Sequence, residues 1–233
     1  MTEKQHQIHL ILTEAGLEFV PKKWRKKKSV QKKIRKYGNS ASLLDTAFHH
    51  HLMKKLPESK KRGRPDILHH FLLDALGSPL NFQGLLAIYF SAPSGLYKVS
   101  SGMRCPRNYR RFKGLMAQLL KLGHIPPNPP FFIEKVSPTL NAWMKNRFSD
   151  DNTIKFTSKG KNTVFKELVD IMFPESMISR DWAVMIGGFQ KGSFSNSIKQ
   201  IPGQKISISS RGFDSWIITQ RFLSLAEMSL GII

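Results

Sequence analysis

Hydrophobic positions along this chain fall into two patterns that alternate from one end to the other. Short apolar runs of strand length occur as "IHLIL" at 8–12, "GLLAIYF" at 84–90, "GLYKVSS" at 95–101, "WAVMIGGF" at 182–189 and "KISISS" at 205–210. Segments with helical spacing lie between them. Because strands that alternate with helices pack in layers, the pattern predicts an α/β fold with a largely parallel sheet.

The helical segments carry their apolar residues at three- and four-residue spacing. They are "SLLDTAFHHHLMKKL" at 42–56, Asp66 to Leu76, a segment that begins near Pro106, and Phe213 to Met228. Pro65 suits the first turn of the second helix, because its missing N–H would be unpaired there anyway. Gly77 ends that helix. After the third helix, "HIPPNPP" at 124–130 predicts a rigid break between sublayers.

The segment "MRCPRNYRRFKGLMAQLLKLG" at 103–123 places four arginines directly before an apolar helical repeat. With Pro106 at the first helical position, the core-forming side chains share one side of the helix: Phe112, Leu115, Met116 and Leu119. Arg107 and Arg111 then fall on the opposite side, and Arg104 precedes the proline at the helix entrance. Guanidinium groups beside a helix N-terminus suit a phosphate. A solvated helix entrance is the alternative interpretation.

The charge balance of the chain indicates a partner. Among 233 residues, 37 Lys plus Arg stand against 16 Asp plus Glu, a formal net charge of +21. A polyanion would neutralise this excess, so nucleic acid is the leading partner. We find no apolar run of about 18 residues and no signal-peptide pattern, and we expect a soluble, unexported protein without a membrane partner. A single cysteine, Cys105, excludes an intrachain disulfide and suits a reducing compartment.

The most basic stretch of the chain runs from Lys22 to Lys36. Ten of its fifteen residues are Lys or Arg, and none is acidic. This composition fits a solvated or disordered basic arm, and it fits equally an arm or helix that faces RNA. The two interpretations are compatible with each other.

The motif "RGRPD" at 62–66 embeds one carboxylate in cationic surroundings. Asp66 follows Pro65 at the start of a predicted helix, with Arg62 and Arg64 close by. The nearby positive charges favour the ionised carboxylate. A first-turn residue that interacts with the helix dipole is the alternative role for Asp66.

Two further patterns bear on cofactors and metals. In "IGGFQKG" at 186–192, glycines follow a buried strand, as in many cofactor sites at the carboxyl ends of strands. The spacing matches neither a dinucleotide motif nor a P-loop, and a tight turn is the alternative. The histidine runs at 49–51 and 69–70 lack a clear set of ligands, so we predict no metal site.

Taken together and in this order, the motifs resemble a known family. "LLDTAFHHHLMKKL", "RGRPDILHHFLLDALGSPLNFQGLLAIYF", "MRCPRNYRRFKGLMAQLL", "IGGFQKGSF" and "ISISSRGF" are similar to segments of the pseudouridine-N1 methyltransferases of small-subunit ribosome biogenesis, members of the SPOUT class. The resemblance covers most of the chain from Ile8 onward. It implies a homodimer of single SPOUT-like methyltransferase domains over 1–233, with a C-terminal trefoil knot that forms an S-adenosylmethionine pocket at about 155–233.

The resemblance also implies roles for individual residues. Catalytic positions fall on Asp66 and Arg64, and RNA-binding positions on Arg64, Arg104, Arg107 and Arg111. S-adenosylmethionine-binding positions fall on Thr157, Gly187, Gly192, Ile206, Ser207, Ile208, Ser209, Ser210, Arg211 and Phe213. The "QKG" at 190–192 departs from the family, which commonly has Pro or Ala and then His before the glycine.

The implied reaction is S-adenosylmethionine-dependent methylation of N1 of a pseudouridine in small-subunit ribosomal RNA, with a role in subunit assembly. Arginines aimed at the base carbonyls would stabilise the charge that develops there, and Asp66 would orient them rather than accept the proton. Two alternatives stay open: a non-catalytic rRNA-binding assembly factor, and a related SPOUT methyltransferase acting on tRNA. Ribosomal proteins or assembly factors are further expected partners, in the cytoplasm or, in a eukaryote, the nucleolus.

Overall fold

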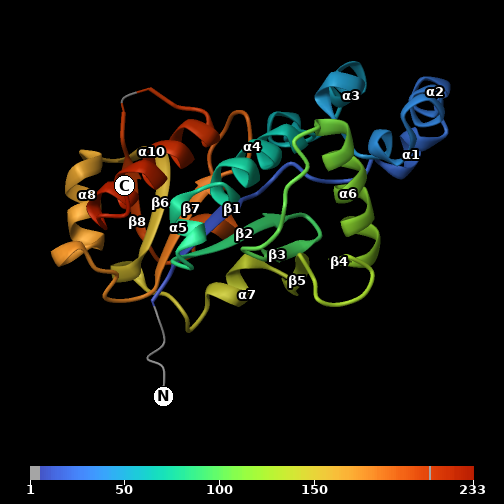
Figure 1. Cartoon of the computed structure of the whole chain (residues 1–233). Coiled ribbons are helices and arrows are strands. Elements are labelled where there is room, and N and C mark those ends of the chain that lie inside the picture. Colours follow the sequence, from blue (N-terminus) through green and yellow to red (C-terminus); the bar gives the residue numbers. More distant parts are fainter. Residues whose placement is uncertain (1–5, 210) are drawn as a thin grey trace.

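The computed structural model describes residues 6–209 and 211–233. Within them, eight strands form one sheet in the order β4-β5-β3-β2-β1-β7-β6-β8 (Figure 1). The strands are β1 (Ile8–Thr13), β2 (Leu86–Ala92), β3 (Gly95–Val99), β4 (His124–Ile125), β5 (Ile133–Ser137), β6 (Thr153–Asn162), β7 (Trp182–Gly187) and β8 (Gln204–Ser207). The α/β class predicted from the sequence is confirmed.

Helices lie on both faces of the sheet and beyond one end of it (Figure 1). They are α1 (Lys22–Arg25), α2 (Lys28–Tyr37), α3 (Thr46–Met53), α4 (Pro65–Leu76), α5 (Pro79–Phe82), α6 (Tyr109–Leu122), α7 (Leu140–Met144), α8 (Phe165–Met172), α9 (Asn196–Lys199) and α10 (Ser215–Ser229). One face packs against α4, α6, α8 and α10, and the other against α7 and α9. Helices α1, α2 and α3 gather at the α6 end of the molecule (Figure 1).

The sheet has a parallel half and an antiparallel half. Strands β2, β1, β7, β6 and β8 run parallel to one another, whereas the pairs β2–β3, β3–β5 and β5–β4 are antiparallel. The change occurs where β2 turns directly into β3, with Ala92 opposite Gly95. A turn this short can only reverse the chain, because a parallel connection needs a crossover of a dozen residues or more. The predicted largely parallel sheet is therefore correct for one half.

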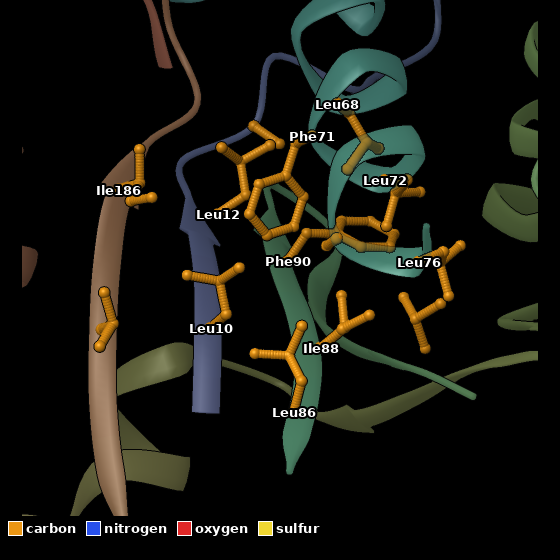
Figure 2. Close-up of a cluster of buried hydrophobic side chains, with 14 of the residues drawn as sticks. Leu10, Leu12, Leu68, Phe71, Leu72, Leu76, Leu86, Ile88, Phe90 and Ile186 are labelled. Atoms are coloured by element: carbon orange, nitrogen blue, oxygen red, sulfur yellow. The ribbon is translucent and has the colours of Figure 1, made fainter. Parts of the chain in front are cut away.

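The main core lies between the sheet and α4. Successive residues of a strand point to opposite faces, so Leu10 and Leu12 of β1 face α4 while Ile11 faces the α7 side. Figure 2 shows Phe71 of α4 projecting toward Leu12 and Phe90, which pair in register across β1 and β2. Phe71 and Phe90 are fully buried. Truncating either ring to alanine should cost about 3–5 kcal/mol of stability, which identifies this layer as the scaffold of the molecule.

Helix α6 begins at Tyr109, so the start that the sequence predicts near Pro106 is wrong. Asn108 is the N-cap, and its side chain accepts a hydrogen bond from the N–H of Arg111 at 3.1 Å. The carbonyl of Pro106 lies 2.7 Å from Nε2 of His69 on α4. An asparagine cap satisfies a free N–H of the first turn and is preferred over a residue without a polar side chain. The residues before the cap are held against α4 instead of joining the helix.

The proline-rich stretch at 124–130 does not separate sublayers, so that prediction is also wrong. Strands β4 and β5 pair across it, with Ile125 opposite Ile133 in the same sheet. Both side chains are buried in the main core. The prolines thus occupy the turn of an edge hairpin. Proline has no N–H group, but residues of this turn do not need one for hydrogen bonding between the strands.

The basic segment from Lys22 to Lys36 folds as α1 and most of α2. Trp24 and Val30 are buried in a small cluster with residues of the α3 region. Most of the lysines are exposed on the other sides of these short helices. The segment is therefore solvated, as predicted, but the disordered form of that interpretation is wrong. An RNA-facing surface stays a prediction.

Candidate functional site

A pocket of about 570 Å³ opens at one end of β6, β7 and β8. Phe156, Ile186 and Ile206 of these strands line it, together with the loops that follow. The register between β6 and β8 shifts between Phe156 and Lys161. Gly160 permits the close approach, since a Cβ there would lie 2.5 Å from the backbone of Ile206. Such a position, at the carboxyl ends of parallel strands, is where α/β proteins commonly bind ligands.

Every described residue of the predicted S-adenosylmethionine set lines this pocket, hereafter the loop pocket. They are Thr157, Gly187, Gly192, Ile206, Ser207, Ile208, Ser209, Arg211 and Phe213. Ser210 lies outside the described residues. Further residues outside the predicted set also line the pocket: Ser158, Phe189, Gln190, Lys191, Ser193, Phe194, Asp214 and Ser215. Asp214 directly follows the "ISISSRGF" motif, so its place in the sequence could have indicated that it lines the pocket.

Two glycines shape the loop after β7. A Cβ on Gly187 would lie 3.1 Å from the ring of Phe189, and Gly192 has a φ of +127°, which L side chains rarely adopt. Ser215 Oγ donates a hydrogen bond to the carbonyl of Gly187 and joins the start of α10 to the end of β7. The backbone of this loop therefore lies directly against the pocket.

The same loop is tied to the segment that precedes α4. The N–H of Gly16 donates to the carbonyl of Gly188 at 3.4 Å, and the N–H of Arg64 donates to the carbonyl of Gly16 at 3.2 Å. Lys61 pairs with Glu14 at 3.3 Å. The turn after β1 therefore connects the loop pocket to Arg64 through three short links.

Arg64 and Asp66 form an ion pair at the start of α4. Nε of Arg64 lies 2.8 Å from Oδ1 and Nη2 lies 2.6 Å from Oδ2 of Asp66, a bidentate arrangement. The hydrogen bonds that Arg64 donates to Asp66 raise the pKa of Arg64; burial opposes this rise, and the charges of Asp66 and Asp214 add to it. Asp214 lines the loop pocket, so its charge couples the pocket to the pair.

The predicted RNA-binding arginines do not share one helical face. Arg107 precedes the Asn108 cap, so the predicted alignment of Arg107 with Arg111 on α6 is wrong. Arg104 and Arg107 lie on the segment held against α4, and Arg111 lies in the first turn of α6. All three side chains are exposed. They therefore surround the entrance of α6 rather than lining one side of it.

Arg111 also reaches the basic helices. It lines a hollow of about 460 Å³ together with Tyr37, Arg110 and Gly114. Tyr37 is the last residue of α2, and the guanidinium of Arg110 lies 5.6 Å from the centre of its ring. The most basic segment of the chain and the arginine segment therefore meet at one surface.

A second ion pair, which no sequence motif indicates, lies beneath this surface. Nζ of Lys113 lies 2.6 Å from Oδ2 of Asp45, and each side chain is only 4% exposed. The hydroxyl of Tyr109 donates to the same oxygen at 3.2 Å. Burial raises the pKa of Tyr109, and the charges of Asp45 and Asp66 raise it further, whereas Arg64 lowers it. Tyr109 is therefore close to both ion pairs.

The sequence predicts no metal site at the histidine runs 49–51 and 69–70. In the described part of the chain, no group of three or more His, Cys, Asp or Glu side chains is placed to hold a metal ion. His49 is buried beside Asp45, and His69 contacts Pro106. No helix within residues 6–209 and 211–233 is long and apolar enough to cross a membrane.

The fold and the site together define an α/β protein with a pocket of small-molecule size and an arginine-rich surface. The sequence profile of the EMG1/NEP1 methyltransferase family matches residues 10–227. The chain belongs to this family, and the family resemblance noted from its motifs is confirmed.

Relatives and a solved structure match the chain over nearly its whole length. Proteins named ribosomal RNA small subunit methyltransferase Nep1 are 36% identical over 229 residues in Staphylothermus marinus, covering 97% of each chain, and 35% identical over 228 residues in Saccharolobus solfataricus. The latter match covers 96% of this chain and 98% of that one. The crystal structure of Archaeoglobus fulgidus Nep1 bound to S-adenosylhomocysteine is 31% identical, with a TM-score of 0.80, and covers 97% of this chain and 99% of that chain.

Proposed function

We propose that this protein transfers a methyl group from S-adenosylmethionine to N1 of a pseudouridine in small-subunit ribosomal RNA. One observation carries the proposal: the loop pocket contains every described residue of the predicted S-adenosylmethionine set. The Archaeoglobus relative was solved with S-adenosylhomocysteine, the molecule that remains when S-adenosylmethionine has given up its methyl group. The relatives named above are small-subunit rRNA methyltransferases, which supports RNA as the acceptor.

The loop pocket suits S-adenosylmethionine in size and in lining. Its volume of about 570 Å³ falls within the range of small-molecule sites, roughly 300–1,000 Å³. Ile206 and Ile208 offer apolar surface to the adenine, and the hydroxyl of Thr157 offers a partner to a polar group. Arg211 and Asp214 provide both signs of charge for the zwitterionic amino-acid end. When bound, S-adenosylmethionine supplies a methyl group activated by its sulfonium charge.

Arg64 and Asp66 are the residues we assign to the target base. Loss of the imide-like proton from N1 of pseudouridine spreads negative charge onto the neighbouring carbonyl oxygens. Arg64, electrostatically coupled to the pocket through Asp214, can donate hydrogen bonds to such an oxygen and stabilise it. Asp66 engages the guanidinium through both carboxylate oxygens and so fixes its direction. A carboxylate engaged in this way orients the arginine and is a poor general base.

The target nucleotide must leave its RNA stack to reach a pocket of this kind. Arg104, Arg107 and Arg111 are exposed around the entrance of α6 and are assigned to the flanking phosphates. Helix α2 adds a basic surface where Tyr37 meets the same segment. Each phosphate contact releases counterions, so RNA binding should weaken as salt rises.

The proposal extends to the architecture and surroundings of the protein. The family resemblance supports one domain over 1–233 whose C-terminal part, about 155–233, is tied in a trefoil knot. It also supports a homodimer, and the exposure of Phe82 and Met228, at 74% and 64%, leaves apolar surface that a second copy can cover. We place the protein with ribosomal proteins or assembly factors of the small subunit, in the cytoplasm or, for a eukaryotic source, the nucleolus.

The experiment uses the purified full chain, S-adenosylmethionine and two synthetic rRNA stem-loops. One stem-loop carries a pseudouridine at the target position, and its control carries uridine, whose N1 is bonded to the sugar and can accept no methyl group. Mass spectrometry should find one added methyl on the first RNA and none on the second. Calorimetry should show that S-adenosylmethionine binds the chain.

Other outcomes distinguish the alternatives. A chain that binds RNA but neither binds S-adenosylmethionine nor methylates any RNA would be a non-catalytic assembly factor. Methylation of tRNA with no product on ribosomal RNA would make the protein a related methyltransferase with another substrate. Methylation of both stem-loops would overturn the assignment to N1 of pseudouridine.

A further inference from the structure

A second hollow adjoins the loop pocket. It has a volume of about 700 Å³ and lies between the segment around Lys60 and the loop from Lys191 to α9. Residues 191–194 line both cavities. The segment around Lys60 also leads directly into Arg64. We call this cavity the lysine hollow.

Three cations of the lysine hollow are open to a ligand. Lys60, Lys191 and Lys199 are exposed, and no carboxylate pairs with them among the contacts of the described residues. Lys61 differs, because it lies 3.3 Å from Glu14 and 3.8 Å from Glu58. The net charge that the hollow presents is therefore positive even though Glu58 also lines it.

The remaining lining donates hydrogen bonds but offers no stacking surface. The polar side chains are Ser59, Ser193, Ser195 and Asn196. The floor is apolar and consists of Leu56 and Phe194, which are 9% and 7% exposed. The ring of Phe194 is buried, and it makes a T-shaped contact with Phe189 at 5.9 Å, so it offers no exposed face to a base. A site with cations and hydroxyls but no exposed ring suits phosphate and ribose rather than nucleobases.

We propose that the lysine hollow binds the phosphate backbone of the RNA strand that flanks the target nucleotide, without reading its bases. This inference rests on the proposed function, because the strand reaches the hollow only when its target nucleotide lies at the loop pocket. The arginines around α6 form one cationic contact with the RNA, and the lysine hollow forms a second one on the loop from 191 to 199. Lysine suits this role, since it acts as a flexible point charge without directional preference.

The test combines changes in the protein with changes in the RNA. Lys60→Ala and Lys199→Ala are introduced together, and Lys191 is left intact because it also lines the loop pocket. The probe is the rRNA stem-loop, either native or with neutral methylphosphonate linkages at successive positions on both sides of the target. Lys121→Ala with Lys145→Ala is the matched control, since both lysines are exposed and lie outside both cavities.

The log–log dependence of RNA affinity on salt should fall by about 1.4 units in the Lys60/Lys199 variant, because each single-strand phosphate contact contributes about 0.7. Neutral linkages at one or two positions should weaken binding by wild type and have no further effect in this variant. Base changes at the same positions should leave affinity within about twofold. Melting temperature, S-adenosylmethionine affinity and the methylation rate at saturating RNA should match the control.

Three results would overturn the inference. The first is a wild-type salt dependence in the Lys60/Lys199 variant, and the second is a neutral-linkage effect that persists in full at every position. Loss of binding to a ribosomal protein without any change in RNA binding would likewise assign the hollow to a protein partner. The salt dependence and the neutral-linkage effect measure binding, so they stay informative if wild type methylates no RNA. Absence of methylation by wild type would contradict the proposed function, not this inference.

Discussion

The two ion pairs near Tyr109 have the same chemistry but opposite surroundings. Lys113 and Asp45 are 4% exposed on each side, whereas Arg64 and Asp66 are 16% and 32% exposed. The buried pair is held by α6 and the cap of α3, and the open pair lies at the start of α4 next to the loop pocket. The comparison separates a pair that maintains the fold from a pair that remains available to a substrate.

Tyr109 connects the two environments. Its hydroxyl donates to Asp45, and its ring lies 5.6 Å from that of His69 on α4. The side chain thus fixes the α6 entrance against both the buried pair and the helix that carries Asp66. We expect changes in the buried pair to act through stability, and changes in the open pair to act through the reaction.

The largest effect is expected from Asp45→Ala. This change leaves the Lys113 ammonium buried without a counter-charge and removes the acceptor for the α3 cap at the N–H of Ala47. Breaking a buried pair from one side costs about 3–5 kcal/mol of stability. Chemical denaturation of wild type and variant measures the difference.

Asp45→Asn combined with Lys113→Met is the control for this prediction. It keeps an oxygen at the cap and removes both charges, and replacing a buried pair by uncharged groups is often neutral. Stability close to wild type in the double variant, with a large loss in Asp45→Ala, supports a scaffold role. An equal loss of stability in Asp45→Ala and in the double variant would show that the pair stabilises the fold through packing and not through charge.

A somewhat smaller effect, on a different quantity, is expected from Arg64→Ala. The methylation rate should fall roughly 10²- to 10³-fold, about 3–4 kcal/mol, the cost of removing a donor aimed at developing negative charge. Stability should change by no more than about 1 kcal/mol, because partly exposed pairs contribute little. Single-turnover methylation and denaturation curves measure the two quantities separately.

Arg64→Lys sharpens this prediction. Lysine keeps the charge but cannot engage both oxygens of Asp66, so its rate should lie between those of wild type and Arg64→Ala. If Arg64→Ala unfolds as easily as Asp45→Ala while its folded fraction methylates RNA at the normal rate, the two pairs do not differ in role.

A third difference concerns pH, because His49 packs beside the buried pair and accepts a hydrogen bond from the N–H of Asp45 at 3.2 Å. Burial lowers the pKa of His49 to about 4, with the charge of Lys33 adding to the effect and that of Asp45 opposing it. Unfolded histidine titrates near 6.5, so between about 6.5 and 4 the unfolded state binds a proton that the folded state does not. The stability from this group is complete above pH 6.5 and is lost as pH falls toward 4.

At pH 5 the loss from His49 amounts to about 2 kcal/mol. His49→Asn keeps an acceptor for the N–H of Asp45 but does not titrate in this range, so its stability should depend less on pH between 4 and 6.5. Denaturation midpoints across this range test the difference. Parallel curves for the two proteins would exclude His49 as the titrating group.

The sequence predicts the apolar strands and helices well, and its failures have physical causes. Strand β6 escaped notice because its pattern contains Lys155, a buried residue whose ammonium bonds to the carbonyl of Ile201. A long side chain can bury its stem and satisfy its charge locally, which no alternation of polar and apolar residues reveals. The start of α6 was misplaced because the Asn108 cap outweighs the preference of Pro106 for a first turn.

Some parts of the candidate site could likewise be predicted from the sequence, and others could not. Gly187 and Gly192, which belong to the "IGGFQKG" motif, line the loop pocket, and so does Thr157, although the family match is weak just before it. The partners of Tyr109 and Lys113 lie 64 and 68 residues away in sequence, and only the fold brings them together. Contacts of this kind depend on how helices dock, which local spacing does not encode.

The smallest effects are expected from the exposed arginines around α6. They extend the comparison from paired, buried charges to charges that are exposed to solvent. Arg107→Ala and Arg111→Ala should each weaken RNA binding by roughly 1–2 kcal/mol, the range of a charge-assisted contact partly screened by solvent. Arg110→Ala should matter less for RNA, because this guanidinium already lies over the ring of Tyr37. Melting temperature and S-adenosylmethionine affinity should stay close to wild type in all three. If Arg107→Ala and Arg111→Ala instead lower the melting temperature and leave RNA affinity intact, the exposed arginines serve the fold, as Lys113 does.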